Sequence, residues 1–226
     1  MRTYPIMLDV RGRLCVVVGA GRVGLRKAEG LLAAGAKVRL VAPHPPPGPL
    51  PAEVEVRPRS YEPGDLDGSL LVFACTNDAG LNARVAADAR RRGALVNVVD
   101  DPPHCDFYAP AVFAEGDVVL AVGTGGSAPT LAAALRDRAA AAMPAGVGPF
   151  AAALEQARKI VLAASADGRR RHALMKRLAG EEGLAAFAQG GPAEVLALAQ
   201  RLVNDNANAG HRGTESTENR GDPPEV

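Results

Sequence analysis

The chain has 226 residues, of which 26 are Lys or Arg and 25 are Asp or Glu, so its formal net charge is +1. This length allows one large domain or two smaller ones with a real hydrophobic core. The balanced charge gives no reason to expect a nucleic-acid or membrane partner. No apolar run approaches the ~18 residues that a membrane-spanning helix requires.

The chain contains three cysteines, Cys15, Cys75 and Cys105, and two of them sit within apolar runs. Their odd number and these surroundings indicate reduced core thiols rather than a disulfide framework. The first residues show no charged-then-apolar signal pattern. We therefore expect a cytoplasmic protein.

Short β-branched runs alternate with helical patterns over the first hundred residues. Val23, Ala28 and Leu31 recur at helical spacing, and Gly35 stands where such a helix would end. This alternation is typical of βαβ units with a parallel sheet, so we predict an α/β fold with a Rossmann-like doubly wound sheet in domain 1–110. The predicted strands are 14–18, 38–42, 54–58, 70–75 and 94–99, and a second helix is predicted at 79–92.

The pattern changes after residue 110. Residues 111–146 predict an antiparallel hairpin around a Glu-Gly-Asp turn, then a Gly-rich loop and a helix with Ser127 as N-cap and Pro129 in its first turn. Residues 147–203 show helical periodicity without a strand pattern, which indicates a small helical domain. Residues 204–226 contain few apolar side chains and predict a disordered tail.

The segment GAGRVG, between the first predicted strand and its helix, places Gly19, Gly21 and Gly24 at the G-x-G-x-x-G spacing. The first glycine permits a tight turn, the second lets a pyrophosphate approach the backbone, and the third lets the helix pack against the strand. A merely tight βα turn is the alternative. The strand before the motif and the helix after it favour dinucleotide binding.

The fingerprint lacks the acid that usually ends the second strand and holds the ribose hydroxyls, because VAPHPPP offers none. His44 could contact the adenosine side of the cofactor. A lone histidine in a proline loop is more often simply solvated. An ordinary dehydrogenase or a nucleotide-sensing domain would usually carry the missing acid.

Together these segments resemble the N-terminal module of siroheme synthase, the precorrin-2 dehydrogenase/sirohydrochlorin ferrochelatase family. The resemblance covers residues 1–145 well and the helical region loosely. It departs at Thr124, where the family often has serine, and no methyltransferase half follows, so a trifunctional enzyme is not expected. The matching segments are YPIMLDVRGRLCVVVGAGRVGLRKAEGLLAAGAKVRLVAP, FACTNDAGLNARV, VNVVDDP and VVLAVGTGGSAPTLAAALRDR.

The resemblance implies an NAD-dependent oxidation of precorrin-2, a tetrapyrrole, to sirohydrochlorin. It further implies that ferrous iron is a second substrate if the chain is also a chelatase, and that a homodimer forms through residues 111–146. The preference for NAD over NADP rests on the family alone. In the family the aspartate that ends the NVVD strand, here Asp100, serves both reactions. Implied cofactor contacts, besides the glycines, are Arg22, Val23, Pro43, His44, Thr76 and Asn77.

The tetrapyrrole carries many carboxylates, so guanidinium and ammonium groups should line its cleft, although each basic residue alone is more often a solvated surface charge. We expect the Gly-rich loop and Arg136 to contact the substrate. The loop residues are Thr124, Gly125, Gly126 and Ser127, and further basic candidates are Arg26, Lys27, Arg138 and Arg169–Arg171.

Asp100 lies at the carboxyl end of a predicted parallel strand, where ligands bind in open α/β sheets, and a carboxylate can serve as base. Its neighbour Asp101 should point to the opposite side of an extended strand end and act as a turn residue. His104 and Cys105 lack a second Cys/His pair, so an ordinary loop is favoured over a stable metal site, with transient iron contact as a third reading.

Two other functions are compatible with parts of the sequence. A non-catalytic NAD-sensing regulatory domain would explain GAGRVG but not Asp100, the Gly-rich loop or the missing ribose acid. A chelatase or iron-delivery protein could keep the nucleotide pocket only as scaffold. The latter stays open because both activities would use one carboxylate.

Overall fold

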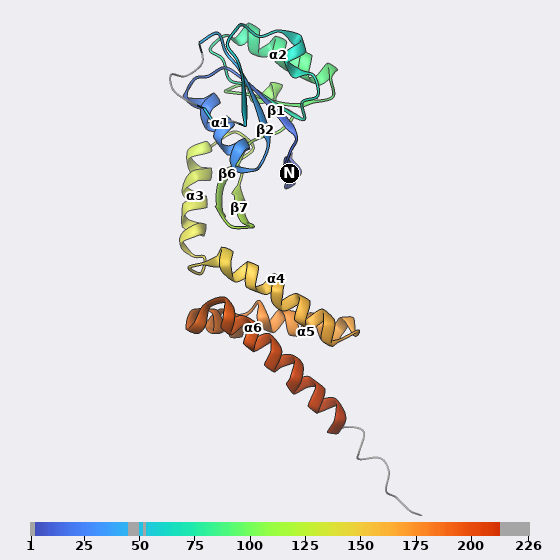
Figure 1. The fold of residues 1–226 in the computed structure, drawn as a ribbon. Coiled ribbons are helices and arrows are strands. Elements are labelled where there is room, and N and C mark those ends of the chain that lie inside the picture. The colour runs from blue at the N-terminus through green and yellow to red at the C-terminus, as the bar shows by residue number, and fades with distance from the viewer. Residues whose placement is uncertain (1–2, 45–49, 52, 213–226) are drawn as a thin grey trace, which may run out of the picture. The chain divides into compact units, whose positions relative to one another are not determined.

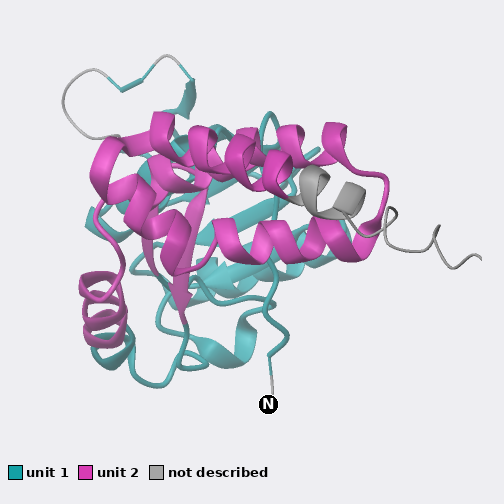
Figure 2. Ribbon diagram, turned by 90° about the horizontal axis from the view of Figure 1, so that it is seen from below, with its two compact units in different colours: residues 1–111, 123–132 teal, residues 112–122, 133–226 magenta. Residues whose placement is uncertain are grey.

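The structure is a computed structural model that describes residues 3–44, 50–51 and 53–212 (Figure 1). The chain divides into two compact units, coloured separately in Figure 2. The N-terminal unit holds residues 1–111 and 123–132, and the C-terminal unit holds residues 112–122 and 133–226. Each unit is described by itself.

The N-terminal unit is built on a five-stranded parallel sheet with strand order β3-β2-β1-β4-β5. This order and the parallel pairing confirm the Rossmann-like α/β fold. Val17 of the central strand pairs with Leu40 on one side and Phe73 on the other. The strands are β1 (Leu14–Val18), β2 (Lys37–Val41), β3 (Val54–Arg57), β4 (Leu71–Ala74) and β5 (Leu95–Val98).

Alternate residues of β1 enter different cores. Cys15 and Val17 pack in a cluster with Ala28 and Leu31 of helix α1 (Arg22–Ala33), whereas Val16 and Val18 pack with Val85 and Ala89 of helix α2 (Ala79–Arg91). Successive side chains of a strand point to opposite faces of its sheet. Both faces are therefore covered, which explains why β1 is a continuous apolar run.

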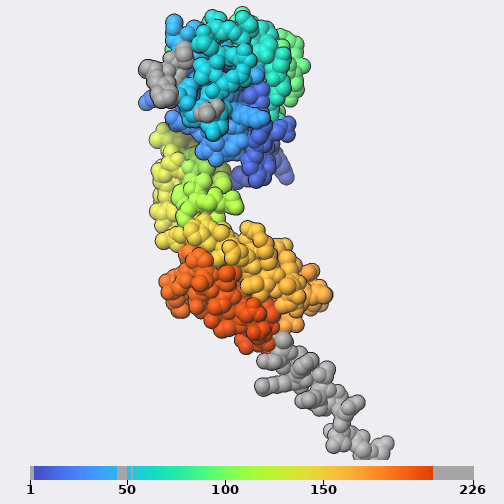
Figure 3. Space-filling model, in the orientation of Figure 1, coloured from blue at the N-terminus to red at the C-terminus, as the bar shows by residue number. Residues whose placement is uncertain are grey.

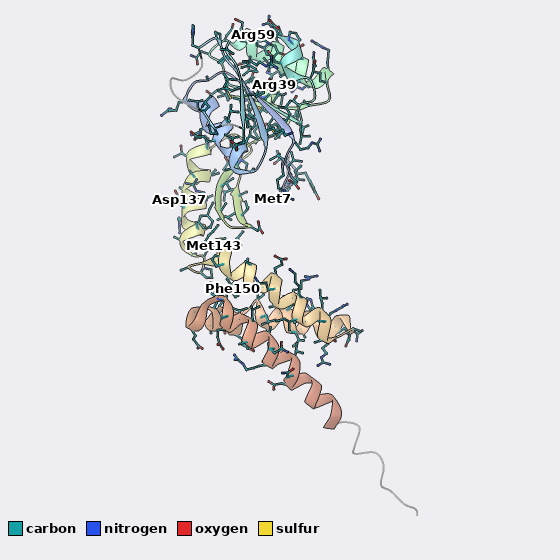
Figure 4. All side chains as sticks on the ribbon, in the orientation of Figure 1. Met7, Arg39, Arg59, Asp137, Met143 and Phe150 are labelled. Atoms are coloured by element: carbon teal, nitrogen blue, oxygen red, sulfur yellow. The ribbon has the colours of Figure 1, made fainter. Side chains whose placement is uncertain are left out.

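Charged side chains fix the chain where it leaves the edge strand β3. Arg59 donates two hydrogen bonds to the Asp65 carboxylate, at 2.9 and 2.7 Å, and Arg39 donates to the Asp65 carbonyl at 2.7 Å; both arginines are labelled in Figure 4. Asp65 is buried within the short 3-10 helix η1 (Pro63–Leu66). A buried carboxylate is stable only when it is paired in this way, so the ion pair anchors the crossover to β4.

The C-terminal unit contains a two-stranded antiparallel sheet, β6 (Ala111–Glu115) and β7 (Val118–Val122), which confirms the predicted hairpin. Helix α3 (Pro129–Ala141) begins in the N-terminal unit and ends in the C-terminal one. Helix α4 (Val147–Ala164) starts against the hairpin. A side chain at Gly148 would lie 2.5 Å from the carbonyl oxygen of Glu115, so only glycine permits this approach.

Helices α4, α5 (Gly168–Leu178) and α6 (Glu181–Arg212) pack side by side, as Figure 3 shows. Their shared core includes Ala157, Val161, Leu174, Leu178 and Leu202, all buried. A second cluster near the start of α4 joins Phe150 and Phe187, whose ring centres are 5.3 Å apart. Helix α6 is interrupted at Gly190 and Gly191, immediately before Pro192.

The expectation of a disordered tail from residue 204 is wrong for its first nine residues, because α6 continues to Arg212. Residues 213–226 lie outside the described part of the chain. The physical reason is that a helix already nucleated and packed through Leu202 and Val203 extends at one hydrogen bond per residue. Within the described residues, no helix is long and apolar enough to cross a membrane.

Candidate functional site: a dinucleotide cleft with a free carboxylate

The site lies at the carboxyl edge of the sheet, where the connections from β1 and β4 run in opposite directions. Helix α1 leads from β1 to β2, and helix α2 leads from β4 to β5 on the other face. A parallel sheet opens a crevice at such a switch point, outside the carboxyl ends of its strands. The glycine loop and the loop after β4 flank this crevice.

The three motif glycines have different physical roles. Gly19 has a φ of 106°, and a side chain there would lie 2.6 Å from the carbonyl oxygen of Cys75. A side chain at Gly24 would lie 2.0 Å from the carbonyl oxygen of Gly19. Gly21, by contrast, has nothing within 4 Å of the place where a side chain would begin. The first and third glycines therefore serve packing, whereas the second leaves open space for a ligand.

Helix α1 presents an uncapped, cationic N-terminus. Gly21 is its N-cap, no side chain caps its backbone N–H groups, and its first turn contains no acid. Arg22 and Arg26 line a shallow hollow along the helix together with Leu25 and Glu29. Free N–H groups and the helix dipole favour an anion at this end, so the cradle fits the pyrophosphate of a dinucleotide.

A second hollow, of about 370 Å³, opens at the same edge of the sheet. It contains three of the cofactor residues that the resemblance implies, namely Gly19, Pro43 and Thr76. His44 and Asn77 are exposed next to these residues but do not line the hollow. Its remaining walls are Val18, Val41, Ser60, Tyr61, Asp78, Gly80, Leu81 and Arg84.

Asn82, a residue with no predicted role, holds the loop after β4. Its side chain accepts hydrogen bonds from the backbone N–H of Thr76, at 3.2 Å, and from the Thr76 hydroxyl, at 2.7 Å, and it donates to the Thr76 carbonyl at 3.0 Å. Asp78 caps α2 by accepting from the Leu81 N–H at 3.0 Å. Asn82 is buried in α2, and a buried amide without a hydrogen-bond partner would destabilise the fold. An asparagine on the apolar face of the predicted helix was therefore the signal that it has a structural role.

Asp100 follows β5 in a turn and has a φ of 58°, the one positive φ outside glycine among the described residues. Its side chain is exposed and makes no hydrogen bond or ion pair with any residue of the described ranges. Asp tolerates this left-handed conformation better than most residues, at some cost in free energy. The carboxylate is therefore free at the carboxyl end of a parallel strand.

The expected opposition of Asp100 and Asp101 along an extended strand is wrong, because β5 ends at Val98 and the chain turns at once. What separates the two carboxylates is their pairing. Asp101 lies 2.8 Å from Nδ1 of His104 in a short 3-10 turn. Asp101 is thus a turn residue, as predicted, and Asp100 is the unpaired acid.

The sulfur of Cys105 is committed to the backbone of β5. It accepts from the Val98 N–H and donates to the Val98 carbonyl, both at 3.2 Å, while the Asn97 amide donates to the Phe107 carbonyl at 2.9 Å. Burial raises the pKa of the Cys105 thiol. Among the residues that can be described, no three His, Cys, Asp or Glu side chains are grouped to hold a metal ion. The arrangement supports a structural role for this cysteine.

The Gly-rich loop closes on itself beside the acidic turn. The Ser127 hydroxyl donates a hydrogen bond to the carbonyl of Thr124 at 2.7 Å. Between them, Gly125 and Gly126 have φ of 62° and 82°. A side chain at Gly126 would lie 3.0 Å from the Tyr108 ring, and the Tyr108 hydroxyl donates to the Pro102 carbonyl at 3.2 Å. The loop and the turn after β5 are therefore neighbours.

The prediction that Ser127 caps helix α3 is wrong. The helix begins at Pro129, and the Ser127 hydroxyl bonds backwards to Thr124 rather than forwards to a helical N–H. The Thr124 hydroxyl instead accepts from the backbone N–H of Ala128 at 3.2 Å. A glycine pair in the left-handed region lets the loop fold back, which the linear order of residues does not reveal.

Lys27 brings a half-buried ammonium to the same face as Phe73 and Phe107. Its Nζ lies 5.5 Å from the centre of the Phe73 ring, which meets Phe107 edge-on at 5.3 Å. Burial lowers the pKa of Lys27. Burial also raises the pKa of the Cys75 thiol to about 11, with the charge of Lys27 acting against this shift and that of Asp100 adding to it.

Of the basic residues expected to bind substrate, Arg136 is already bound by Asp137, at 2.8 and 2.6 Å, within the C-terminal unit. Arg170 donates to the Val203 carbonyl at 3.5 Å and so belongs to the helical core. Arg138 and Arg169 are exposed. Lys27, among these candidates, is the one for which the structure gives a half-buried site beside the sheet edge.

The fold and this site define a dinucleotide-binding α/β protein. Residues 6–111 match the model of a family described as "Putative NAD(P)-binding". The chain is 44% identical over 155 residues to the siroheme synthase of Chromobacterium violaceum, and 39% identical over 175 residues to that of Methylobacillus flagellatus. These alignments cover 67% and 76% of this chain, but 33% and 38% of the relatives.

The chain is therefore similar to the N-terminal modules of siroheme synthases, and it spans about a third of the length of the relatives named above. A solved structure titled "SirC, precorrin-2 dehydrogenase" superposes with a TM-score of 0.71 at 22% identity, covering 88% of this chain and 100% of that one. That likeness confirms the fold.

Proposed function

We propose that the chain is an NAD-dependent dehydrogenase that oxidises precorrin-2 to sirohydrochlorin. The observation that carries this proposal is the free carboxylate of Asp100, held in a left-handed turn at the same carboxyl edge of the sheet as the glycine loop. Backbone strain of this kind persists where surrounding structure enforces it and is frequent at functional sites. The similarity to siroheme synthases supplies the substrate class.

The proposed reaction removes one hydride and one proton from the tetrapyrrole. When bound, NAD supplies the hydride acceptor and leaves as NADH. The Asp100 carboxylate accepts the proton, because it is exposed and carries no competing partner among the described residues. Gly21 and the start of α1 would hold the cofactor's pyrophosphate, with Arg22 and Val23 in the first turn.

Substrate binding is assigned to groups around the acidic turn. The loop of Thr124, Gly125, Gly126 and Ser127 supplies backbone N–H groups and hydroxyls next to Tyr108. Lys27 supplies an ammonium whose contact in the free protein is the ring of Phe73. Burial disfavours its positive charge, so a carboxylate of the substrate would stabilise the charged form. Arg136 would first have to leave Asp137.

Ferrous iron insertion is a second reaction that the same carboxylate can serve. Chelation releases two pyrrole N–H protons from sirohydrochlorin, and Asp100 is a suitable acceptor. In this reading the iron is a substrate and the protein needs no resident metal. A non-catalytic NAD sensor would need no unpaired acid at this place.

The deciding experiment compares Asp100→Asn with Asp101→Asn. We expect Asp100→Asn to fold, since asparagine also adopts the left-handed conformation, and to lose precorrin-2 turnover by about a hundredfold or more. Asp101→Asn is the matched control, because its amide can still bond to His104, and it should turn over close to the wild-type rate. Turnover is followed as NADH absorbance with precorrin-2 and saturating NAD.

Three outcomes would contradict the proposal. Equal losses in the two variants, or a larger loss in Asp101→Asn, would show that Asp100 is not the base. A wild type that binds NAD but never oxidises precorrin-2 would favour the NAD-sensing alternative. Iron insertion into sirohydrochlorin without any dehydrogenase activity would favour a chelatase with a vestigial nucleotide pocket.

A further inference from the structure

Arg84 is a cation on α2 with no established task. Its side chain lines the hollow that also contains Gly19, Pro43 and Thr76. The carbon of its guanidinium lies 5.9 Å from the centre of the Tyr61 ring. Across the described ranges of the chain, Arg84 forms no hydrogen bond or ion pair with another residue. A guanidinium that rests on an aromatic ring and leaves its N–H groups without a hydrogen bond to the described residues is available to a ligand.

The position of Arg84 is set by a buried network beneath it. Tyr61 is 6% exposed, and its hydroxyl donates to the Asp88 carboxylate at 2.9 Å. Asp88 is 1% exposed and is also paired with Arg91. The Tyr61 ring is therefore fixed, and a fixed aromatic face restricts where the guanidinium rests. Arg84 is presented to the hollow from a rigid support.

The strand order determines which half of a dinucleotide reaches Arg84. The pyrophosphate cradle at Gly21 follows β1, Asp100 follows β5, and Pro43 follows β2 on the other side of β1. A cofactor that presents its nicotinamide near Asp100 must extend its adenosine towards β2. The hollow reaches that side through Val41 and Pro43, and its opposite wall, which includes Arg84, comes from the connection between β4 and α2.

We infer that Arg84 binds the adenine ring of the cofactor by stacking its guanidinium on the ring face. This inference deepens the proposed function and rests on it. No acid follows β2 within residues 42–44 to hold the ribose, so the adenosine must be recognised otherwise. Asp78, whose carboxylate caps α2, also lines this hollow, and its negative charge disfavours a 2′-phosphate there, which makes the planar base the better occupant.

The test measures affinities for whole and partial cofactors by calorimetry. Arg84→Ala should weaken NAD, ADP-ribose and AMP by about tenfold, as expected for loss of one cation–π contact, and should leave nicotinamide mononucleotide unaffected. Arg84→Lys should not restore the affinity, because an ammonium has no planar face. The KM for NAD should rise in Arg84→Ala. Arg158→Ala, an exposed arginine of α4, is the control for a general loss of charge.

Several results would overturn the inference. Unchanged AMP affinity in Arg84→Ala, or equal losses for AMP and nicotinamide mononucleotide, would remove Arg84 from the adenine site. A much larger loss for NADP than for NAD would assign it to a 2′-phosphate instead.

Gly21→Asp separates this inference from the proposed function. It places a carboxylate where the pyrophosphate should lie, so it should abolish NAD binding whatever Arg84 does. If Gly21→Asp binds NAD like the wild type, the cofactor site itself is wrong and the Arg84 inference falls with it. If only the Arg84 variants behave as wild type, the cofactor site stands and the stacking role does not.

Discussion

At the residue scale, two ionisable groups near the carboxyl edge of the sheet, Lys27 and Cys75, are partly buried, and burial disfavours the charged form of each. Lys27 is half-buried over Phe73, and the Cys75 thiol lies under the glycine loop, where Gly19 approaches its carbonyl. Burial lowers the pKa of Lys27 and raises that of Cys75. Both groups become easier to ionise when a ligand brings an opposite charge or when solvent enters. Among the described residues, the Lys27 ammonium has no carboxylate partner, so an anionic ligand can pair with it.

The pKa of Cys75 yields a prediction about pH. Its folded-state value is about 11, against an ordinary value of 9.0, so the unfolded chain loses the thiol proton first. The stabilisation from the protonated thiol is complete below pH 9 and is lost as pH rises towards 11. We expect Cys75→Ala to gain roughly 2 kcal/mol relative to wild type between pH 8 and pH 11.

Urea unfolding of both proteins at pH 8, 9.5 and 11 measures this difference, with Cys105→Ala as a second comparison. Alkylation by iodoacetamide at pH 7.5, read by peptide mass spectrometry, should label Cys75 slowly, because the thiolate is the nucleophile. Fast labelling of Cys75 at that pH would show that its thiol is not protonated as the burial requires.

At the element scale, α6 shows how packing decides where a helix ends. Leu202 and Val203 are buried against α4 and α5, and the helix then runs on to Arg212. Gly190 and Gly191 interrupt the same element, because Gly191 has a φ of 63° and Pro192 cannot donate a backbone hydrogen bond. The part of α6 that follows Pro192 is held in place because its apolar side chains pack against α4 and α5.

We predict that this packing, and not the segment beyond Arg212, stabilises the helical bundle. Removing residues 213–226, whose only apolar side chain is Val226, should leave the melting temperature unchanged. Leu202→Ala should cost about 2–4 kcal/mol, because it removes a buried leucine from a packed cluster. Thermal and urea unfolding followed by circular dichroism compares the two variants. A larger loss from the truncation than from Leu202→Ala would contradict this assignment.

At the scale of the whole molecule, several apolar side chains of residues 111–146 lack cover within the described chain. Val112 and Val119 of the hairpin are 47% and 44% exposed, and Leu131 and Leu135 of α3 are also exposed. A two-stranded hairpin is marginally stable in water by itself. A second copy of the chain would cover these side chains, which supports the homodimer implied by the resemblance.

We expect a homodimer that dissociates when a charge is placed on this surface. Val119→Asp should shift the mass in light scattering from dimer towards monomer, because a carboxylate would be buried without a partner. Leu162→Asp is the matched control, since Leu162 on α4 is 45% exposed but lies outside residues 111–146. A wild-type mass equal to one chain at every concentration would refute the dimer.

The strands and helices of the N-terminal unit followed closely from local pattern. The run LCVVV predicts a buried strand, and the glycine spacing in GAGRVG requires a tight turn whatever the rest of the chain does. The end of α6 did not follow, because residues 204–212 become helical only by continuation from a packed segment. The role of Ser127 was likewise hidden, because the direction of its hydrogen bond depends on a loop that folds back.

The sequence by itself determined the α/β fold, the dinucleotide cradle and the placement of Asp100 at the end of a strand, because short-range periodicity and glycine stereochemistry govern them. Tertiary structure alone decided which of the adjacent carboxylates is free. Asp101 is paired with His104, and Asp100 stands in a left-handed turn. Tertiary structure also placed Arg84, Tyr61 and Pro43 around one hollow. These residues are far apart in the sequence, and the order of the strands in the sheet decides that they lie close together.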